Sequence, residues 1–501
     1  MPAGMRFASV MREAPASSAR SREQGGRIGP LFLVALVLGG CAAVGPDYKA
    51  PEPGVPAAWQ RSAAGSSVGM DSGILDHSHW WANFDDPLLA DLVEQALAGS
   101  PDVKAALARL REARARRGVA AAERFPTLGA SASIRRSTSS GESGSGQTRD
   151  LYAAGFDAGW ETDLFGGRRR ALEAAQADLA AAAAELGDVR ITLAAEVALN
   201  YVELRDYQTR LDIARRNLAS QEETLDLTRW RALAGLTTAL DVEQARSSLE
   251  QTRAQMPGLR TGAVAAQNRL AVLLGRNPGD LDGQLAAVRP IPSPPRTIAV
   301  GIPADALRRR PDIRAAERNL AAATARIGEA EADRYPDFSL SGTLGLESLA
   351  LDSLFGGGAV TRSLAASLAA TLFDGGRIRR NIEIRTALQE QALASYETTV
   401  LNALEEVENI LAGLANRQAE RDALRVATGS ARSAAALAQA QYSSGLVDFQ
   451  TVLDTQRSVL SLESQLSSAE SEIVSEVIRL YKALGGGWAG AAEAGPDGRL
   501  E

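Results

Sequence analysis

The chain has 501 residues, of which 45% are apolar but only 5% aromatic, and its formal net charge is −7. It is too apolar for a disordered chain and too poor in aromatic residues for a typical enzyme core, and its negative charge argues against a nucleic-acid-binding protein. One cysteine and two histidines exclude a disulfide framework and a multi-cysteine metal site, so we expect neither an enzyme nor a bound cofactor.

The N-terminus carries the pattern of an export signal. Residues 31–38 are an uninterrupted apolar run, Arg20, Arg22 and Arg27 lie shortly before it, and Gly39-Gly40-Cys41 follows it. Eight apolar residues are too few to span a bilayer, which predicts a signal peptide over residues 1–40. Leu38 to Cys41 resembles a bacterial lipobox, which implies that Cys41 is acylated and becomes the mature N-terminus. The alternative is an ordinary signal peptide with an incidental cysteine. An aspartate directly after the cysteine would resemble an inner-membrane retention signal. This chain has Ala42 at that position, which favours the outer membrane.

The rest of the chain contains an internal duplication. Pro101-Asp102-Val103 and Pro311-Asp312-Ile313 each open an Ala/Arg-rich helical stretch, and Gly235-Leu236 and Gly445-Leu446 recur at the same offset of 210 residues. We therefore expect an N-terminal segment over residues 41–100, a first repeat over 101–277, a proline-rich linker over 278–303, a second repeat over 304–485 and a tail over 486–501.

Each repeat contains a predicted pair of strands. Apolar and polar residues alternate clearly over residues 151–163 and 337–347 and more weakly over 128–135 and 361–371. A period of two gives each strand one apolar and one polar face. The Ser/Gly-rich segments between paired strands predict two hairpins, each with an apolar face that needs a cover.

The apolar face of the hairpins can be covered in two ways, by a further layer of a soluble protein or by a lipid bilayer. The export signal and the small residues on the polar faces favour a transmembrane β-barrel. Four strands cannot close a barrel, because known barrels start at about eight strands, and open strand edges are not tolerated in lipid. The chain must then oligomerise, as a dimer with about eight strands or a trimer with about twelve.

Long helices follow the strands in both repeats. Residues 168–233 and 377–442 contain no proline, and their apolar positions step by threes and fours, as in a coiled coil. At 1.5 Å per residue each helix extends roughly 100 Å. Helices of this length must project from the membrane, to form a tube or to reach a partner.

Taken together, these features resemble the outer-membrane efflux proteins of the TolC type, specifically the lipoprotein channels that serve resistance–nodulation–division (RND) pumps. The resemblance runs from Cys41 to Trp488. It implies a mixed α and β fold: a homotrimer with a 12-stranded transmembrane β-barrel, four strands per chain, continuing into a periplasmic α-helical barrel. It also implies a periplasmic adaptor protein and an inner-membrane RND transporter as partners, and small molecules as cargo. The segments that carry the resemblance are Val44 to Tyr48, Trp80 to Leu88, Asn268 to Gly275, Arg308 to Ile313, Leu372 to Arg377 and Tyr481 to Trp488.

The long helices turn at Gly235 and Gly445, and glycine suits such turns because it accepts positive φ. The resemblance implies that the two turns form a periplasmic aperture closed by polar pairs. It places the constriction and latch at Asp241, Tyr442, Asp454 and Arg457. The alternative for the two aspartates is that they only cap the return helices.

Two other classes of protein remain as alternatives. A periplasmic adaptor lipoprotein also carries coiled-coil hairpins, but it has one central hairpin where this chain repeats two. An exported lipoprotein hydrolase would need a catalytic site. Gly65 to Gly69 satisfies G-x-S-x-G but lies in a Ser/Gly/Ala-rich stretch. His77 and His79 have no further histidine to complete a metal site.

Overall fold

The computed structural model describes residues 43–52, 54–60, 69–71, 79–295, 297–300 and 302–487. The predicted signal peptide, Cys41, His77 and most of the predicted tail therefore lie outside the described residues. The helices and strands agree with the mixed α and β fold class predicted above.

Both repeats have the same order of elements, which confirms the duplication. In the first repeat these are α3 (Pro101–Ala122), β2 (Thr127–Thr138), β3 (Thr148–Thr162), α4 (Gly167–Leu233) and α5 (Ala239–Leu273). In the second they are α8 (Pro311–Ala332), β5 (Asp337–Ser348), β6 (Val360–Ala369), α9 (Arg377–Ser443) and α10 (Phe449–Ala483).

Shorter elements connect and flank the two repeats. The segment predicted as a linker is partly structured, because it contains α6 and strand β4, which pairs in parallel with β1. The shorter elements are β1 (Gly69–Asp71), η1 (Trp80–Phe84), α2 (Pro87–Gly99), α6 (Asp282–Leu285), β4 (Thr297–Ala299), α7 (Pro303–Arg309), η2 (Leu351–Ser353) and η3 (Gly357–Ala359).

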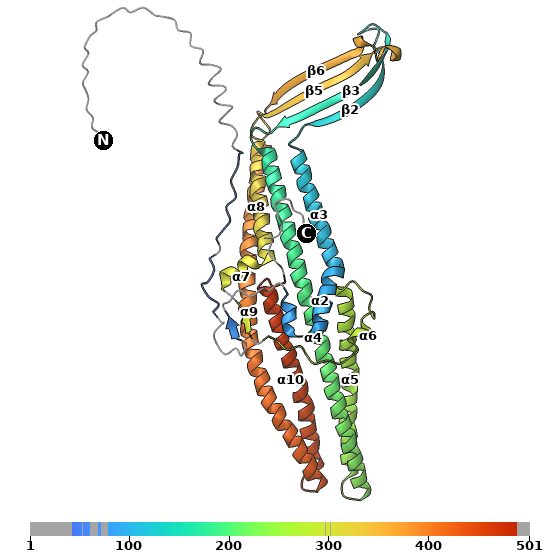
Figure 1. Cartoon of the computed structure of the whole chain (residues 1–501), viewed down its shortest axis with the longest axis vertical. Helices are drawn as coiled ribbons and strands as arrows, with labels where there is room; N and C mark the ends of the chain where they lie inside the picture. Colours follow the sequence, from blue (N-terminus) through green and yellow to red (C-terminus); the bar gives the residue numbers. More distant parts are fainter. Residues whose placement is uncertain are drawn as a thin grey trace, which may run out of the picture. The chain divides into compact units, whose positions relative to one another are not determined.

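The two long helices start in the same way. Each follows a glycine with positive φ, Gly166 at 85° and Gly376 at 89°. An aspartate just before each glycine accepts backbone N–H groups of the first turn: Asp163 from Arg168 and Arg169, and Asp374 from Gly376 and Ile378. These carboxylates satisfy donors that have no partner inside the helix. Each long helix pairs with its return helix, α4 with α5 and α9 with α10 (Figure 1).

The four long strands form a single antiparallel sheet in the order β2-β3-β5-β6 (Figure 1). The sequence predicted two hairpins, and the pairing of β3 with β5 joins them. At this joint Gly155 lies opposite Gly345, and a Cβ on Gly155 would lie 2.9 Å from the Cα of Gly345. The absence of side chains at both positions therefore allows the two strands to pair here.

The register confirms that the sheet has one apolar and one polar face. Leu128, Phe156, Leu344 and Leu364 lie on the apolar face, and Ser363 and Thr343 hydrogen-bond on the other at 2.7 Å. Leu128 is 73% exposed and Leu364 78% exposed, so the described part of the chain leaves the apolar face uncovered. Strands β2 and β6 are the two edges of the sheet.

The main core lies where η1, α2 and the return helices pack against the middle of α4. Trp80 is fully buried and stacks on Tyr481 with ring centroids 5.4 Å apart. Ala194, Ala195 and Ala198 of α4 are buried in the same cluster, and their small side chains let neighbouring helices approach closely. Across the described segments, no helix combines the length and the apolar character needed to cross a membrane.

Candidate functional site

The two turns between the long and the return helices have the same backbone geometry. Gly235 and Gly445 have φ values of 69° and 79°, which confirms that both turns need positive φ. The residue after each glycine donates its N–H back to the helix, Leu236 to the Arg231 carbonyl at 2.8 Å and Leu446 to the Gln441 carbonyl at 2.9 Å. These bonds satisfy carbonyls at the helix end.

Asp241 caps the first return helix. Its carboxylate accepts the backbone N–H of Thr238 at 3.0 Å, and the Thr238 hydroxyl accepts the N–H of Asp241, which completes a capping box. The Thr237 hydroxyl also donates to this carboxylate. The hydrogen bonds from Thr237 and Thr238 hold the pKa of Asp241 below its ordinary value. Asp241 therefore caps α5, and the structure of one copy leaves its predicted role in the latch a prediction.

The capping alternative is wrong for Asp454. The cap of α10 is Asp448, which accepts the backbone N–H of Thr451 at 3.0 Å. Asp454 lies within α10, is exposed, and accepts a hydrogen bond from Gln450 at 2.9 Å. Arg457, one turn further, is exposed as well, and among the described residues no ion pair joins it to Asp454. The single chain leaves both side chains available to a neighbour.

Tyr442 lies at the contact between the two helical hairpins. Its ring is buried in a cluster with Phe449, Leu225 and Leu249, residues from all four long and return helices. The guanidinium of Arg231, at the end of α4, lies 4.5 Å from the centroid of this ring. Arg231 also donates to the carbonyls of Tyr442 at 2.6 Å and Ser443 at 3.3 Å.

Arg231 was not predicted from the sequence. Basic residues are favoured in the last turn of a helix, where they interact with the helix dipole, and this preference alone gives no sign of a partner 211 residues away. Of the four predicted gate residues, the described chain brings Tyr442 into contact with Arg231 and joins none of the four to another.

Between the core and the turns, the contact of α4 with α10 is polar. Ser467 donates to Asp206 at 2.7 Å, Asn217 donates to Glu463 at 3.2 Å, and Gln456 donates to Thr224 at 2.8 Å. Burial raises the pKa of Asp206, because its carboxylate loses contact with water. The two hairpins are therefore joined along this stretch by hydrogen bonds more than by apolar packing.

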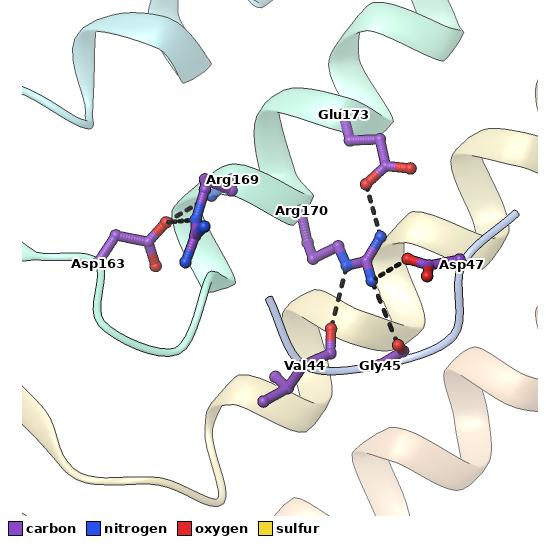
Figure 2. A network of polar contacts seen from close by, with 7 residues as sticks. All are labelled: Val44, Gly45, Asp47, Asp163, Arg169, Arg170 and Glu173. Carbon is purple, nitrogen blue, oxygen red and sulfur yellow. Dashed lines mark hydrogen bonds and ion pairs between the residues drawn. The ribbon is translucent and has the colours of Figure 1, made fainter. Parts of the chain in front are cut away.

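The start of the described chain is held by a buried arginine, Arg170 of α4 (Figure 2). Its guanidinium donates to the carbonyls of Val44 at 3.0 Å and Gly45 at 3.2 Å, and to the carboxylate of Asp47 at 2.8 Å. Glu173, one turn along α4, accepts a further bond at 2.8 Å. The residues around Val44 are thereby fixed to the first turns of α4.

Residues 43–52 and 54–60, which we call the strap, continue along the helices. Val44 donates its N–H to the carbonyl of Phe165 at 2.9 Å, just after strand β3, and Tyr48 donates to Glu317 of α8 at 2.8 Å. Further on, the N–H of Gln60 bonds Glu408 of α9 at 2.7 Å. The strap thus begins at the junction of strands and helices and is tied to α8 and α9.

An acidic cleft lies at the same junction. It is lined by Glu123, Glu161, Asp163 and Asp333 among others, and Arg168 bonds both Glu123 and Glu161. Within the described residues no group of three or more His, Cys, Asp or Glu side chains is arranged to hold a metal ion. The cleft lies where α3, β3, α4 and α8 meet.

The known proteins to which this chain is similar are outer-membrane proteins of efflux systems. A family model described as "Outer membrane efflux protein" matches residues 92–276 and 302–486. The chain is 33% identical over 469 residues to the outer membrane protein OprJ of Pseudomonas aeruginosa, covering 91% of this chain and 95% of that protein. It is also 33% identical over 469 residues to the toluene efflux pump outer membrane protein TtgI of Pseudomonas putida, covering 92% and 98%. The solved structure of the outer-membrane channel OprN matches with a TM-score of 0.84 and 39% identity, covering 89% of this chain and all of that one.

Proposed function

This chain belongs to the outer membrane efflux protein family, and from that premise we propose that three copies of it form a gated exit duct for small molecules. The protein is an outer-membrane channel component of an efflux pump, with a large periplasmic portion. The family is one of transport channels, and we propose that the chain catalyses no reaction and needs no cofactor.

The observation that carries the proposal is the sheet. Its apolar face is exposed, and β2 and β6 leave two edges without partners in the described chain. Lipid tolerates no open edge, and four strands are too few to close a barrel. A homotrimer supplies about twelve strands and closes every edge by pairing β6 of one copy with β2 of the next.

Native mass spectrometry of the detergent-solubilised protein tests the assembly and the anchor together. We expect a trimer in which each subunit begins at Cys41 and carries covalent acyl chains, because the lipobox directs cleavage and acylation there. Cys41→Ser should remove the acyl mass and is the matched control. A wild-type protein that stays monomeric in detergent contradicts the proposed channel.

The turns of the long helices are proposed as the periplasmic gate. Arg231 and Tyr442 tie the two hairpins of one copy together, and Asp241 fixes the first turn. Asp454 and Arg457 are exposed on α10 and free to meet neighbouring copies. In a trimer each such contact occurs three times around one axis, so weak pairs act together.

Replacing Asp454 by alanine should raise the single-channel conductance of the trimer in planar bilayers. Each exposed ion pair contributes about 0.2–1 kcal/mol, so three lost contacts, about 0.6–3 kcal/mol together, should raise the ratio of open to closed channels about threefold to a hundredfold. Glu470→Ala removes a carboxylate from the same helix and should leave the conductance unchanged. An unchanged conductance for Asp454→Ala removes this residue from the gate.

The same turns are proposed as the docking site of a periplasmic adaptor protein, which links the channel to an inner-membrane RND transporter. Leu236 is 68% exposed and Leu446 75% exposed, although both are large and apolar. Trp230, at the end of α4, is 71% exposed. Exposed apolar side chains grouped at a tip are typical of a protein-binding surface.

Leu236→Asp should abolish efflux by the assembled pump while single-channel conductance stays at the wild-type value. The aspartate places a charge in an apolar interface, which costs several kcal/mol when it is desolvated without a partner. Leu236→Met keeps the apolar surface and should retain efflux, measured as drug susceptibility of cells. Wild-type efflux by Leu236→Asp would show that the first turn does not bind the adaptor.

A further inference from the structure

Two arginines lie on the apolar face of the sheet. Arg362 pairs in register with Leu344. It lies two residues from Val360 and two from Leu364 along β6, so the three side chains share one face. Arg136 follows Ile134 by two residues on β2 and therefore shares its face. Both arginines are exposed. Charged side chains on the face that meets lipid are destabilising near the middle of the bilayer and cost little near its surfaces.

The two arginines occupy matching positions in the sheet. Each is the third residue from the loop end of its strand, Arg136 in Thr127–Thr138 and Arg362 in Val360–Ala369. Strands β2 and β6 are the opposite edges of the sheet, and they run antiparallel to each other in its order. When β6 of one copy pairs with β2 of the next, both arginines come to the joint, on the lipid-facing surface and towards the loops.

The charges at this joint do not balance. The carboxylate of Asp150 accepts both bonds of the Arg136 fork, at 2.6 and 2.7 Å. Asp150 is the single acidic residue on the apolar face of the four strands, and among the described residues no ion pair reaches Arg362. Two guanidinium groups and one carboxylate leave a net positive charge at each joint, and like charges on neighbouring strands repel each other.

We propose that each joint between copies binds the phosphate of an anionic lipid in the leaflet that surrounds the loop end of the sheet. The planar fork of arginine matches phosphate oxygens in a bidentate way, and Val360, Leu364 and Ile134 beside it suit acyl chains. The inference rests on the proposed function, because the joint forms only when the barrel closes. The site is made of Arg362 of one copy and the Arg136–Asp150 pair of its neighbour.

The test uses the full-length channel in nanodiscs of neutral lipid. One sample contains lipid A, which is a phosphorylated glycolipid, and the other contains lipid A whose phosphates have been removed. Native mass spectrometry counts the subunits and the lipid A molecules that stay bound. Arg362→Gln should weaken retention of lipid A about tenfold, since a charged hydrogen-bonding partner of the phosphate is lost. Arg135→Gln is the matched control, because Arg135 lies next to Arg136 but on the polar face. It should retain lipid A as the wild type does.

The outcomes separate this inference from the proposed function. Trimers that retain phosphorylated and dephosphorylated lipid equally, or that lose lipid A equally in Arg362→Gln and Arg135→Gln, overturn the lipid site and leave the channel intact. Displacement of lipid A by inorganic phosphate at matched phosphate concentration also overturns it, because the site would then take free phosphate. Monomers in every nanodisc overturn the channel itself.

Discussion

Arg231→Ala should raise the mean conductance of the channel in planar bilayers at least about tenfold. The guanidinium stacks on the buried ring of Tyr442 and donates to two carbonyls at the end of α9, so it joins the two hairpins of one copy. The ring contact contributes about 0.5–2 kcal/mol, and a charged hydrogen bond about 1.5–3 kcal/mol. Losing the ring contact and the hydrogen bonds in all three copies shifts the equilibrium between closed and open gate strongly towards the open state, in which the turns are separated.

Arg229→Ala is the matched control for this variant. Arg229 lies two residues earlier on α4 and makes an exposed ion pair with Asp226 of the same helix at 3.0 Å, so its loss should leave the conductance unchanged. Tyr442→Phe keeps the ring and should behave as the wild type, because the hydroxyl has no hydrogen-bond partner among the described residues. Equal conductance of Arg231→Ala and the wild type would show that this contact does not hold the gate closed.

Gly45→Ala should release the strap from the helices. Gly45 has a φ of 90°, and a Cβ there would lie 2.3 Å from the Cα of Gly328, a backbone atom that cannot move aside. The left-handed conformation alone costs alanine roughly 1–2 kcal/mol, and the clash adds to this. We expect limited proteolysis within residues 43–60 of the assembled channel to become at least about tenfold faster.

Gly54→Ala provides the control within the same segment. Nothing lies within 4 Å of a Cβ built on Gly54, so this variant should be cleaved at the wild-type rate. If Gly45→Ala is cleaved no faster than Gly54→Ala, the strap is not held at this glycine. Intact mass after proteolysis shows where the chain was cut and whether the helices stayed whole.

Much of the fold was predictable because it is local. The spacing of apolar residues along α4 and α9 indicates long helices, and the alternation from Phe338 to Leu346 indicates a strand, without reference to the rest of the chain. The pairing of β3 with β5 was not predictable in this way. It joins residues about 190 positions apart, and alternation says which face a residue lies on but not which strand lies beside it.

The candidate site shows the same limit. The positive φ of Gly235 and Gly445 follows from the type of residue and its place after a long helix. The choice of Asp448 rather than Asp454 as the cap depends on where α10 begins, and helix ends are the least certain feature of a sequence pattern. The partners of Arg231 and Arg170 depend on the packing of helices that are distant in sequence.

The glycine pair at the centre of the sheet has a consequence for how such a chain can change over time. Gly155 and Gly345 come from different repeats and face each other where β3 meets β5. A side chain added at either glycine would push β3 and β5 apart, and these strands belong to different repeats. A substitution at one of the two positions is therefore a problem for both halves of the sheet at once.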